Sequence, residues 1–233
     1  MYIVSSDGHP IDSQHVATAT NVDKLIAMLQ RTVDRLKLKA GKPLVTPAKQ
    51  ASAPEAGADD LVLHLIARNV RRQGDQDVPH RPKLGETRSG NWGAYPAEDW
   101  IVLKKEESKK LLPVSAAKPG GTWEPDPETA ARLLKYFYPS TENNDLRTNR
   151  IDRQTLRATV LSVKDGVVRA RLDGFLKMKH PFYHKDDGNF VEAPLVGLIE
   201  FDAKHSRIRS FQLATDGATY GRMTFGVVVA SQK

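Results

Sequence analysis

The chain has 233 residues, with 35 Lys and Arg against 28 Asp and Glu, so its formal net charge is +7. It contains no cysteine, which excludes disulfides, thiolate nucleophiles, CxxC redox centres and cysteine-ligated zinc or iron–sulfur clusters. Hydrophobic residues make up 39% and charged residues 27%, a mixture typical of a folded chain of one or two domains. No apolar stretch approaches the roughly 18 residues that cross a bilayer, so the sequence predicts no membrane span.

The basic excess is mild, and acidic residues are interleaved through it. Residues 1–60 carry no net charge, and the surplus is divided between 61–150 and 151–233. A nucleic-acid binder usually shows a one-sided basic stripe or a recognisable motif, and neither is present. The sequence therefore argues against a nucleic-acid partner and leaves a protein or a small ligand as the possible binding partner.

The first segment predicts a β-hairpin followed by an amphipathic helix. A short β-type run at 2–4 leads into Asp7-Gly8, a hairpin turn signal, and a return strand follows from Pro10. Asn21 is a favourable N-cap, and apolar residues then recur with helical spacing to about Leu38. Such a unit cannot bury its own apolar face well. Residues 39–60 are rich in Ala, Pro, Lys and Gly without periodicity, which predicts a flexible linker.

The remainder, 61–233, predicts one α+β domain. Its first part holds candidate strands at 61–68 and 100–103, a short helix over 104–112, and a helix over 128–138 capped by Asp126. From Thr155 the residue pattern predicts antiparallel β-strands, with a strong hairpin turn signal at Asp165-Gly166. Five strands are expected, over 155–163, 167–175, 190–202, 206–215 and 222–231. Their sequential connections favour a meander that curls into a barrel or half-barrel, with the 127–138 helix packed against it.

Residues 1–38 resemble the C-terminal end of a thioredoxin-like domain, in which a last hairpin, commonly with an Asp-Gly turn, precedes a final helix on the sheet. The family's CxxC and cis-proline lie upstream of that hairpin, so the resemblance assigns no catalytic residue here. Two interpretations stay open: the chain is the downstream part of a longer thioredoxin-like protein, or the hairpin and helix pack on the C-terminal domain. Residues 61–233 resemble uncharacterised domains attached to such proteins.

The compartment depends on which interpretation holds. The first residues, from Met1 to Asp7, lack a basic stretch followed by an apolar one, so the sequence as written predicts a cytoplasmic protein. A longer thioredoxin-like protein would instead be exported and redox-linked.

The loop 180–187 is the candidate metal site. It holds His180, His184, Asp186 and a second aspartate within eight residues, and imidazole with carboxylate suits a divalent metal such as zinc, copper or iron. His205, at a later turn, is a candidate to approach it. The alternative is a polar hairpin loop, because the spacing matches no specific metal motif.

Four further residues are candidates for ligand binding. Tyr136 and Tyr138 lie on an aromatic-rich helix, where burial in the core is the alternative. Alternation places Ile208, Ser210 and Gln212 on one face of a strand, which looks either into a cavity or into solvent.

No nucleophile elbow, phosphate loop or dinucleotide fingerprint is present. The sequence therefore favours a non-catalytic accessory or binding domain of a thioredoxin-like protein that lacks the dithiol active site. The alternative is a metal-binding protein or metal-dependent enzyme that uses the 180–187 loop.

Overall fold

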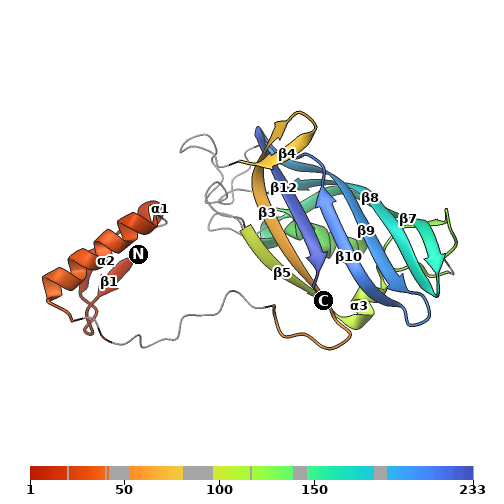
Figure 1. Cartoon of the computed structure of the whole chain (residues 1–233). Coiled ribbons are helices and arrows are strands. Elements are labelled where there is room, and N and C mark those ends of the chain that lie inside the picture. The colour runs from red at the N-terminus through yellow and green to blue at the C-terminus, as the bar shows by residue number, and fades with distance from the viewer. Residues whose placement is uncertain are drawn as a thin grey trace. The chain divides into compact units, whose positions relative to one another are not determined.

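The computed structural model describes residues 1–19, 21–39, 41, 53–80, 97–115, 117–138, 146–180 and 188–232. The chain divides into two compact units, Met1–Ala51 and Ser52–Lys233, shown as ribbons in Figure 1. The division falls inside the predicted linker. In the part of the chain that is described, no helix combines the length and the apolar character needed to cross a membrane.

The N-terminal unit contains the hairpin and the helix that the sequence predicts. Strands β1 (Tyr2–Val4) and β2 (Pro10–Ser13) are antiparallel, and the turn between them uses Gly8 at a φ of +84°, which glycine adopts without steric cost. A single helical turn, α1 (Val16–Ala19), precedes α2 (Val22–Leu36). The Asn21 side chain caps α2 by accepting a hydrogen bond from the Lys24 amide at 3.1 Å.

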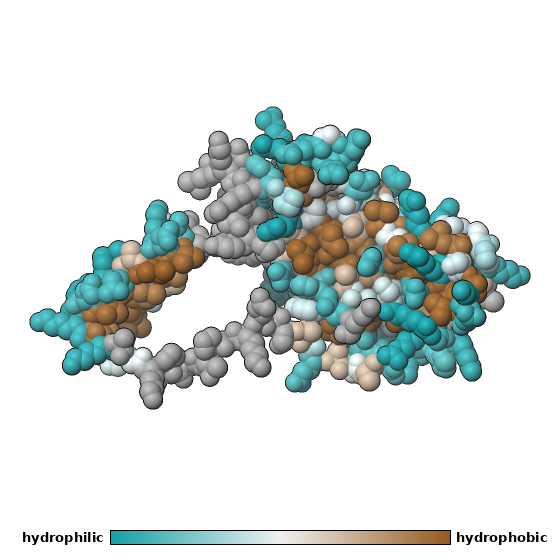
Figure 2. All heavy atoms as spheres, in the orientation of Figure 1, coloured by the Kyte–Doolittle hydropathy of each residue, from teal (hydrophilic) through white to brown (hydrophobic). Residues whose placement is uncertain are grey.

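Helix α2 packs on the hairpin through a narrow face. Its buried residues are Met28 and Thr32, and the Thr32 hydroxyl also donates to the Met28 carbonyl oxygen at 3.0 Å. Next to this face runs a stripe of five apolar residues spaced four, three, four and three apart, each 37–57% exposed: Val22, Ile26, Leu29, Val33 and Leu36. Hydrophobic side chains accordingly gather along one side of this unit in Figure 2. Within the described residues of the unit, the hairpin therefore covers the face with Met28 and Thr32 and leaves the apolar stripe exposed.

The C-terminal unit is built on one antiparallel sheet whose ten described strands run in the order β5-β3-β12-β10-β9-β8-β7-β6, with β4 beside β3, and β11 beside β9 and β12. The predicted meander forms β7 to β12, and the two upstream candidate strands join it because β12 pairs with β3. Among the described strands, the end strands β5 and β6 do not pair with each other, so closure of the sheet into a barrel is not confirmed. The strand bounds are β3 Leu61–Gln73, β4 Gln76–Pro79, β5 Ala97–Leu103, β6 Thr122–Trp123, β7 Arg150–Lys164, β8 Val167–Lys179, β9 Phe190–Asp202, β10 Arg207–Thr215, β11 Ala218–Tyr220 and β12 Met223–Ser231.

Two glycines allow neighbouring strands to approach closely at the centre of this sheet. A Cβ atom on Gly174 would lie 2.3 Å from the Thr155 carbonyl oxygen, and one on Gly197 would lie 2.2 Å from the Gln212 carbonyl oxygen. The two glycines are near neighbours on adjacent strands, because Leu172 of β8 pairs with Gly197 of β9. Glycines at such positions allow a sheet to bend sharply.

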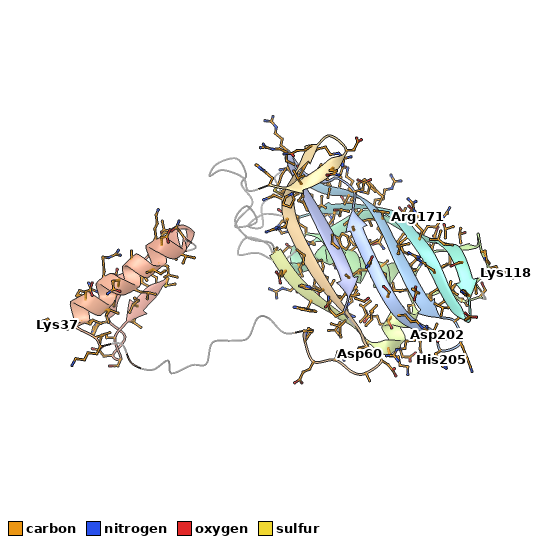
Figure 3. All side chains as sticks on the ribbon, viewed as in Figure 1. Lys37, Asp60, Lys118, Arg171, Asp202 and His205 are labelled. Carbon is orange, nitrogen blue, oxygen red and sulfur yellow. The ribbon has the colours of Figure 1, made fainter. Side chains whose placement is uncertain are left out.

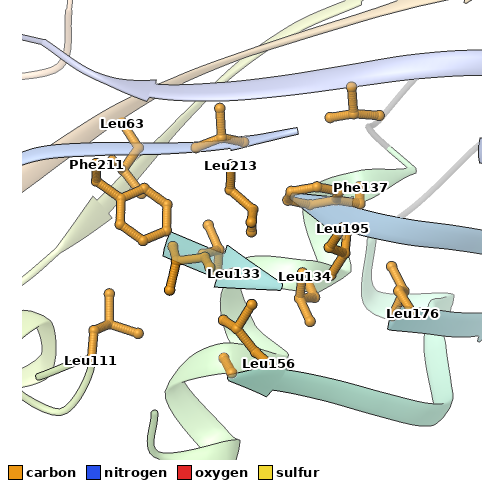
Figure 4. Close-up of a cluster of buried hydrophobic side chains, with 14 of the residues drawn as sticks. Leu63, Leu111, Leu133, Leu134, Phe137, Leu156, Leu176, Leu195, Phe211 and Leu213 are labelled. Carbon is orange, nitrogen blue, oxygen red and sulfur yellow. The ribbon is translucent and has the colours of Figure 1, made fainter. Parts of the chain in front are cut away.

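The helices of this unit are short, and one of them fills a face of the sheet. They are α3 (Lys105–Lys109), α4 (Pro127–Leu134) and the 3-10 turns η2 (Lys135–Phe137) and η3 (Leu146–Thr148). Asp126 caps α4 by accepting from the Thr129 amide at 2.9 Å and from its hydroxyl at 2.7 Å. Figure 4 shows Leu133, Leu134 and Phe137 against leucines of the strands. Each such leucine contributes about 1.5–3 kcal/mol by leaving water. This face of the sheet is therefore a packed core.

Candidate functional site

The structure places Tyr138 and His180 side by side, although the sequence assigns them to separate candidate sites. Tyr138 is 3% exposed, and its ring centroid lies 5.0 Å from that of His180 and 4.9 Å from that of Tyr220. Tyr136 is half-buried and packs at the margin of the core. Both tyrosines therefore belong to the packed region, as the core alternative predicts.

His180 is 1% exposed and is oriented by a buried asparagine. Asn149 Nδ2 donates to the carbonyl oxygens of Lys135 and Tyr138, at 2.8 and 3.2 Å, which turns Asn149 Oδ1 toward His180 Nδ1 at 2.7 Å. Because an amide oxygen only accepts, His180 Nδ1 carries the proton and donates it. A metal on this histidine would have to bind Nε2.

The other residues predicted for the metal site are His184, Asp186 and His205. His184 and Asp186 lie outside the described residues, and the described residues hold no cluster of three or more potential metal-binding side chains. His205 lies in the turn after β9, whereas His180 follows Lys179, which pairs with the first residue of β9. The two histidines are thus at opposite ends of a 13-residue strand, so the expected approach of His205 is wrong. The proposed use of His180, His184 and Asp186 as ligands stays a prediction.

A β-bulge corrects the prediction for Ser210 and Gln212. The pairing between β9 and β10 shifts register between Ile208 and Ser210, so Ile208 pairs with buried Phe201 and packs on the core. Ser210, half-buried, pairs with Glu200 instead, and Gln212 is exposed. The predicted common face of all three residues is therefore wrong. Gln212 borders a shallow, mainly apolar groove of about 500 Å³ lined also by Val196, Leu198, Ala214 and Val228.

A larger cleft, of about 790 Å³, opens where β9 turns into β10, and we call it the hairpin cleft. The segment before β3, the start of α3, the β9–β10 turn and the end of β12 form its walls. Figure 3 shows Asp60, Asp202 and His205 at this end of the sheet. The lining residues are Ala58, Asp59, Asp60, Leu61, Val62, Lys105, Ser108, Asp202, His205, Ser206, Arg207, Ile208, Arg209, Ser231 and Gln232.

Asp60 holds one wall of the hairpin cleft together. Its largely buried carboxylate accepts hydrogen bonds from Lys104 Nζ at 2.9 Å, from the Gly57 amide at 2.9 Å and from the Lys105 amide at 3.1 Å. These donors, Lys104 foremost, lower the pKa of Asp60 below its ordinary value. Residues 57–60, which the sequence assigns to the linker, are thereby fixed to the start of α3.

Asp202 holds the opposite wall. Its carboxylate accepts from Arg209 at 2.8 Å, from His205 Nδ1 at 3.1 Å, and from the backbone amides of Lys204 and His205 at 3.0 and 3.1 Å. These hydrogen bonds, that of Arg209 first, hold the pKa of Asp202 far below its ordinary value of 3.8. The bulge between Ile208 and Ser210 helps to turn Arg209 toward this carboxylate.

The remaining charged groups of the hairpin cleft differ in how they are paired. Lys105 Nζ lies 2.8 Å from Asp59, and this hydrogen bond lowers the pKa of Asp59. Arg207 donates one hydrogen bond, to the Ala58 carbonyl oxygen at 3.2 Å, and within the described chain no carboxylate is at ion-pair distance from it. Each carboxylate of the cleft therefore has a cation at ion-pair distance, whereas Arg207 has no such partner among the described residues and acts on Asp59 only at longer range.

Sequence reasoning missed the hairpin cleft, although a signal for it was present. Asp59-Asp60 precedes β3, and Lys104-Lys105 follows β5, two oppositely charged dipeptides. Leu61 pairs with Leu103, so this antiparallel register brings the two dipeptides together. Comparison with known protein families, with curated proteins and with solved structures finds no match to this chain. Its function is therefore inferred from the geometry of the site.

Proposed function

We propose that residues 52–233 form a non-catalytic binding module that takes a small ligand in the hairpin cleft. The observation that carries this proposal is the contrast between the interior of the fold and one end of its sheet. The face of the sheet under α4 is filled with aliphatic side chains, whereas the hairpin cleft is open and its walls are held by Asp60 and Asp202. Its volume lies within the range of roughly 300–1,000 Å³ that is usual for small-molecule sites.

The electrostatics of the cleft support binding over acid–base catalysis. A general acid or base works best when its pKa lies near the operating pH. The pKa values of Asp59, Asp60 and Asp202 are all lowered instead, by hydrogen bonds from Lys105, Lys104 and Arg209 respectively. Such carboxylates stay ionised and occupied, so they serve to fix the walls of the cleft.

We also propose that the module is an accessory to a thioredoxin-like protein. The support is the exposed apolar stripe of α2 beside a two-stranded hairpin that covers another face of the helix. In the thioredoxin-like fold the final helix packs on a larger sheet, which would cover more of the helix than a hairpin does. The N-terminal unit thus has the surface that such a helix would need.

The binding role is tested by a fragment screen on the full chain, read by ¹H–¹⁵N NMR. We expect fragments that shift amide resonances on both walls, over 58–62 and 202–209. Val62→Trp fills the cleft from a half-buried strand position, so it should abolish these shifts. Val228→Trp, an exposed position outside the hairpin cleft, is the matched control and should preserve them. A folded protein in which no fragment shifts both walls, or in which Val62→Trp changes nothing, would refute the role.

A further inference from the structure

We infer that the ligand of the hairpin cleft is a small organic anion whose carboxylate or phosphate group binds Arg207. This inference rests on the binding role proposed above and specifies the chemical class of the ligand. It starts from the one guanidinium of the cleft that, in the described residues, has no carboxylate at ion-pair distance.

Arg207 has one described hydrogen bond to the protein, and its other donors are available to a ligand. A guanidinium offers five N–H donors in a planar fork, and the described hydrogen bond of Arg207, at 3.2 Å, goes to the neutral carbonyl of Ala58. That bond directs the side chain across the cleft from β10 toward the segment before β3. The remaining edge of the fork fits two oxygens of one carboxylate or phosphate, a geometry that a lysine ammonium does not offer.

The pairing of the charged groups in the cleft favours an anion over a cation. Each carboxylate already has a cation near it: Asp59 has Lys105 at 2.8 Å, Asp60 has Lys104 at 2.9 Å, and Asp202 has Arg209 at 2.8 Å. A cationic ligand would have to displace one of these partners. An anion at Arg207 displaces no ion pair of the described chain, because Asp59, the carboxylate on which Arg207 acts at longer range, is bound to Lys105.

The apolar lining defines the rest of the ligand. Leu61, Val62 and Ile208 contribute aliphatic surface beside the charged groups. An anion without carbon would leave this surface in water, whereas an organic acid or a phosphate ester would cover it. The cleft thus combines a fork for an oxyanion with room for a short apolar body.

The test is an NMR titration of the full chain with three probes: acetate, butyrate and inorganic phosphate. We expect saturable shifts of amides over 58–62 and 204–209, with butyrate binding more tightly than acetate because its longer chain contacts the aliphatic lining. Arg207→Gln should weaken the binding about tenfold or more, since a hydrogen bond to a charged group is lost. Arg207→Lys, which keeps the charge without the fork, should bind with intermediate strength.

Arg222→Gln is the control, because Arg222 is exposed and precedes β12, whose other end lines the cleft, and the variant has the same loss of charge. It should bind every probe as the parent chain does. Preference for phosphate over both carboxylates would identify the oxyanion as a phosphate, and the reverse would identify a carboxylate. The inference is overturned if no probe shifts these amides, or if Arg207→Gln binds as tightly as the parent.

The two proposals fail in distinguishable ways. If fragments bind in a manner sensitive to Val62→Trp while no anion binds, the binding role stands and the assignment to an oxyanion falls. If neither fragments nor anions shift the cleft amides, both fall. Because Arg207 is exposed and its described hydrogen bond is to a single carbonyl, Arg207→Gln should melt like the parent, which separates loss of binding from loss of folding.

Discussion

The two longest helices in the described part of the chain differ in how much of their apolar surface is buried. Helix α2 has 15 residues, and it buries Met28 and Thr32 while a five-residue apolar stripe stays exposed. Helix α4 has eight residues and buries four of them, including Leu133 and Leu134. The longer helix therefore gains less from packing than the shorter one.

The difference shows that helical periodicity and burial are separate properties. The spacing of apolar residues determines which face of a helix can be buried, but the partner surface determines how much is buried. A two-stranded hairpin offers α2 little area, whereas the ten-stranded sheet encloses α4. The N-terminal unit thus depends on capping and local contacts, and the C-terminal unit depends on its core.

The largest expected effect follows from truncating the buried face of α4. Leu133→Ala removes a fully buried side chain that contacts the strands, so the C-terminal unit should lose about 2–5 kcal/mol of unfolding free energy. All three tryptophans of the chain lie in 52–233, so urea denaturation followed by their fluorescence reports on this unit alone. Leu161→Ala, half-exposed on β7, is the control and should change the free energy by less than about 0.5 kcal/mol.

An intermediate effect is expected where the sheet strands approach most closely. Gly197→Ala places a Cβ atom 2.2 Å from the Gln212 carbonyl oxygen, so the strands must separate, at a cost of about 1–3 kcal/mol. The same substitution at Gly226 meets its nearest neighbour, Val70, at an ordinary 3.4 Å and should be close to neutral. Equal midpoints in urea for the two variants would show that the close approach at Gly197 is not needed to enclose α4.

The smallest effect is expected on the exposed stripe of α2. Ile26→Ala should lower the opening free energy of the N-terminal unit, measured by amide hydrogen exchange, by less than about 0.5 kcal/mol. Met28→Ala, in the same helix but fully buried, should lower it by about 2 kcal/mol or more. If Ile26→Ala proved as costly as Met28→Ala, the stripe would be covered in solution, and the contrast between α2 and α4 would disappear.

Local signals in the sequence predicted most of the elements. The Asp7-Gly8 and Asp165-Gly166 pairs do form hairpin turns with glycines at positive φ, and Asn21 and Asp126 do cap helices, because turns and caps depend on residues only a few positions apart. The predicted helix over 104–112 is shorter: it has five residues, Lys105–Lys109, with Lys104 in an extended conformation before it and a turn after it.

Features that depend on register could not be predicted in this way. The bulge between Ile208 and Ser210 reverses the alternation of β10, and nothing in the run of residues marks it. The hairpin cleft exists because β3 and β5 align Asp59-Asp60 with Lys104-Lys105, a pairing across more than forty residues. Residue types were visible in the sequence, but the distances between them were not.

The pairing of β3 with β12 sets the order in which the sheet can be completed during synthesis. β3 spans Leu61–Gln73, whereas its neighbour β12 spans Met223–Ser231, so one edge of β3 stays unpaired until a much later segment of the chain has been made. At translation rates of about 5–20 residues per second, this wait lasts roughly ten to thirty seconds. During that interval β5 can cover one edge of β3, and the other edge presents unpaired backbone with alternating leucines. Recruitment of β12 is therefore the step at which folding of the sheet competes with aggregation of the nascent chain.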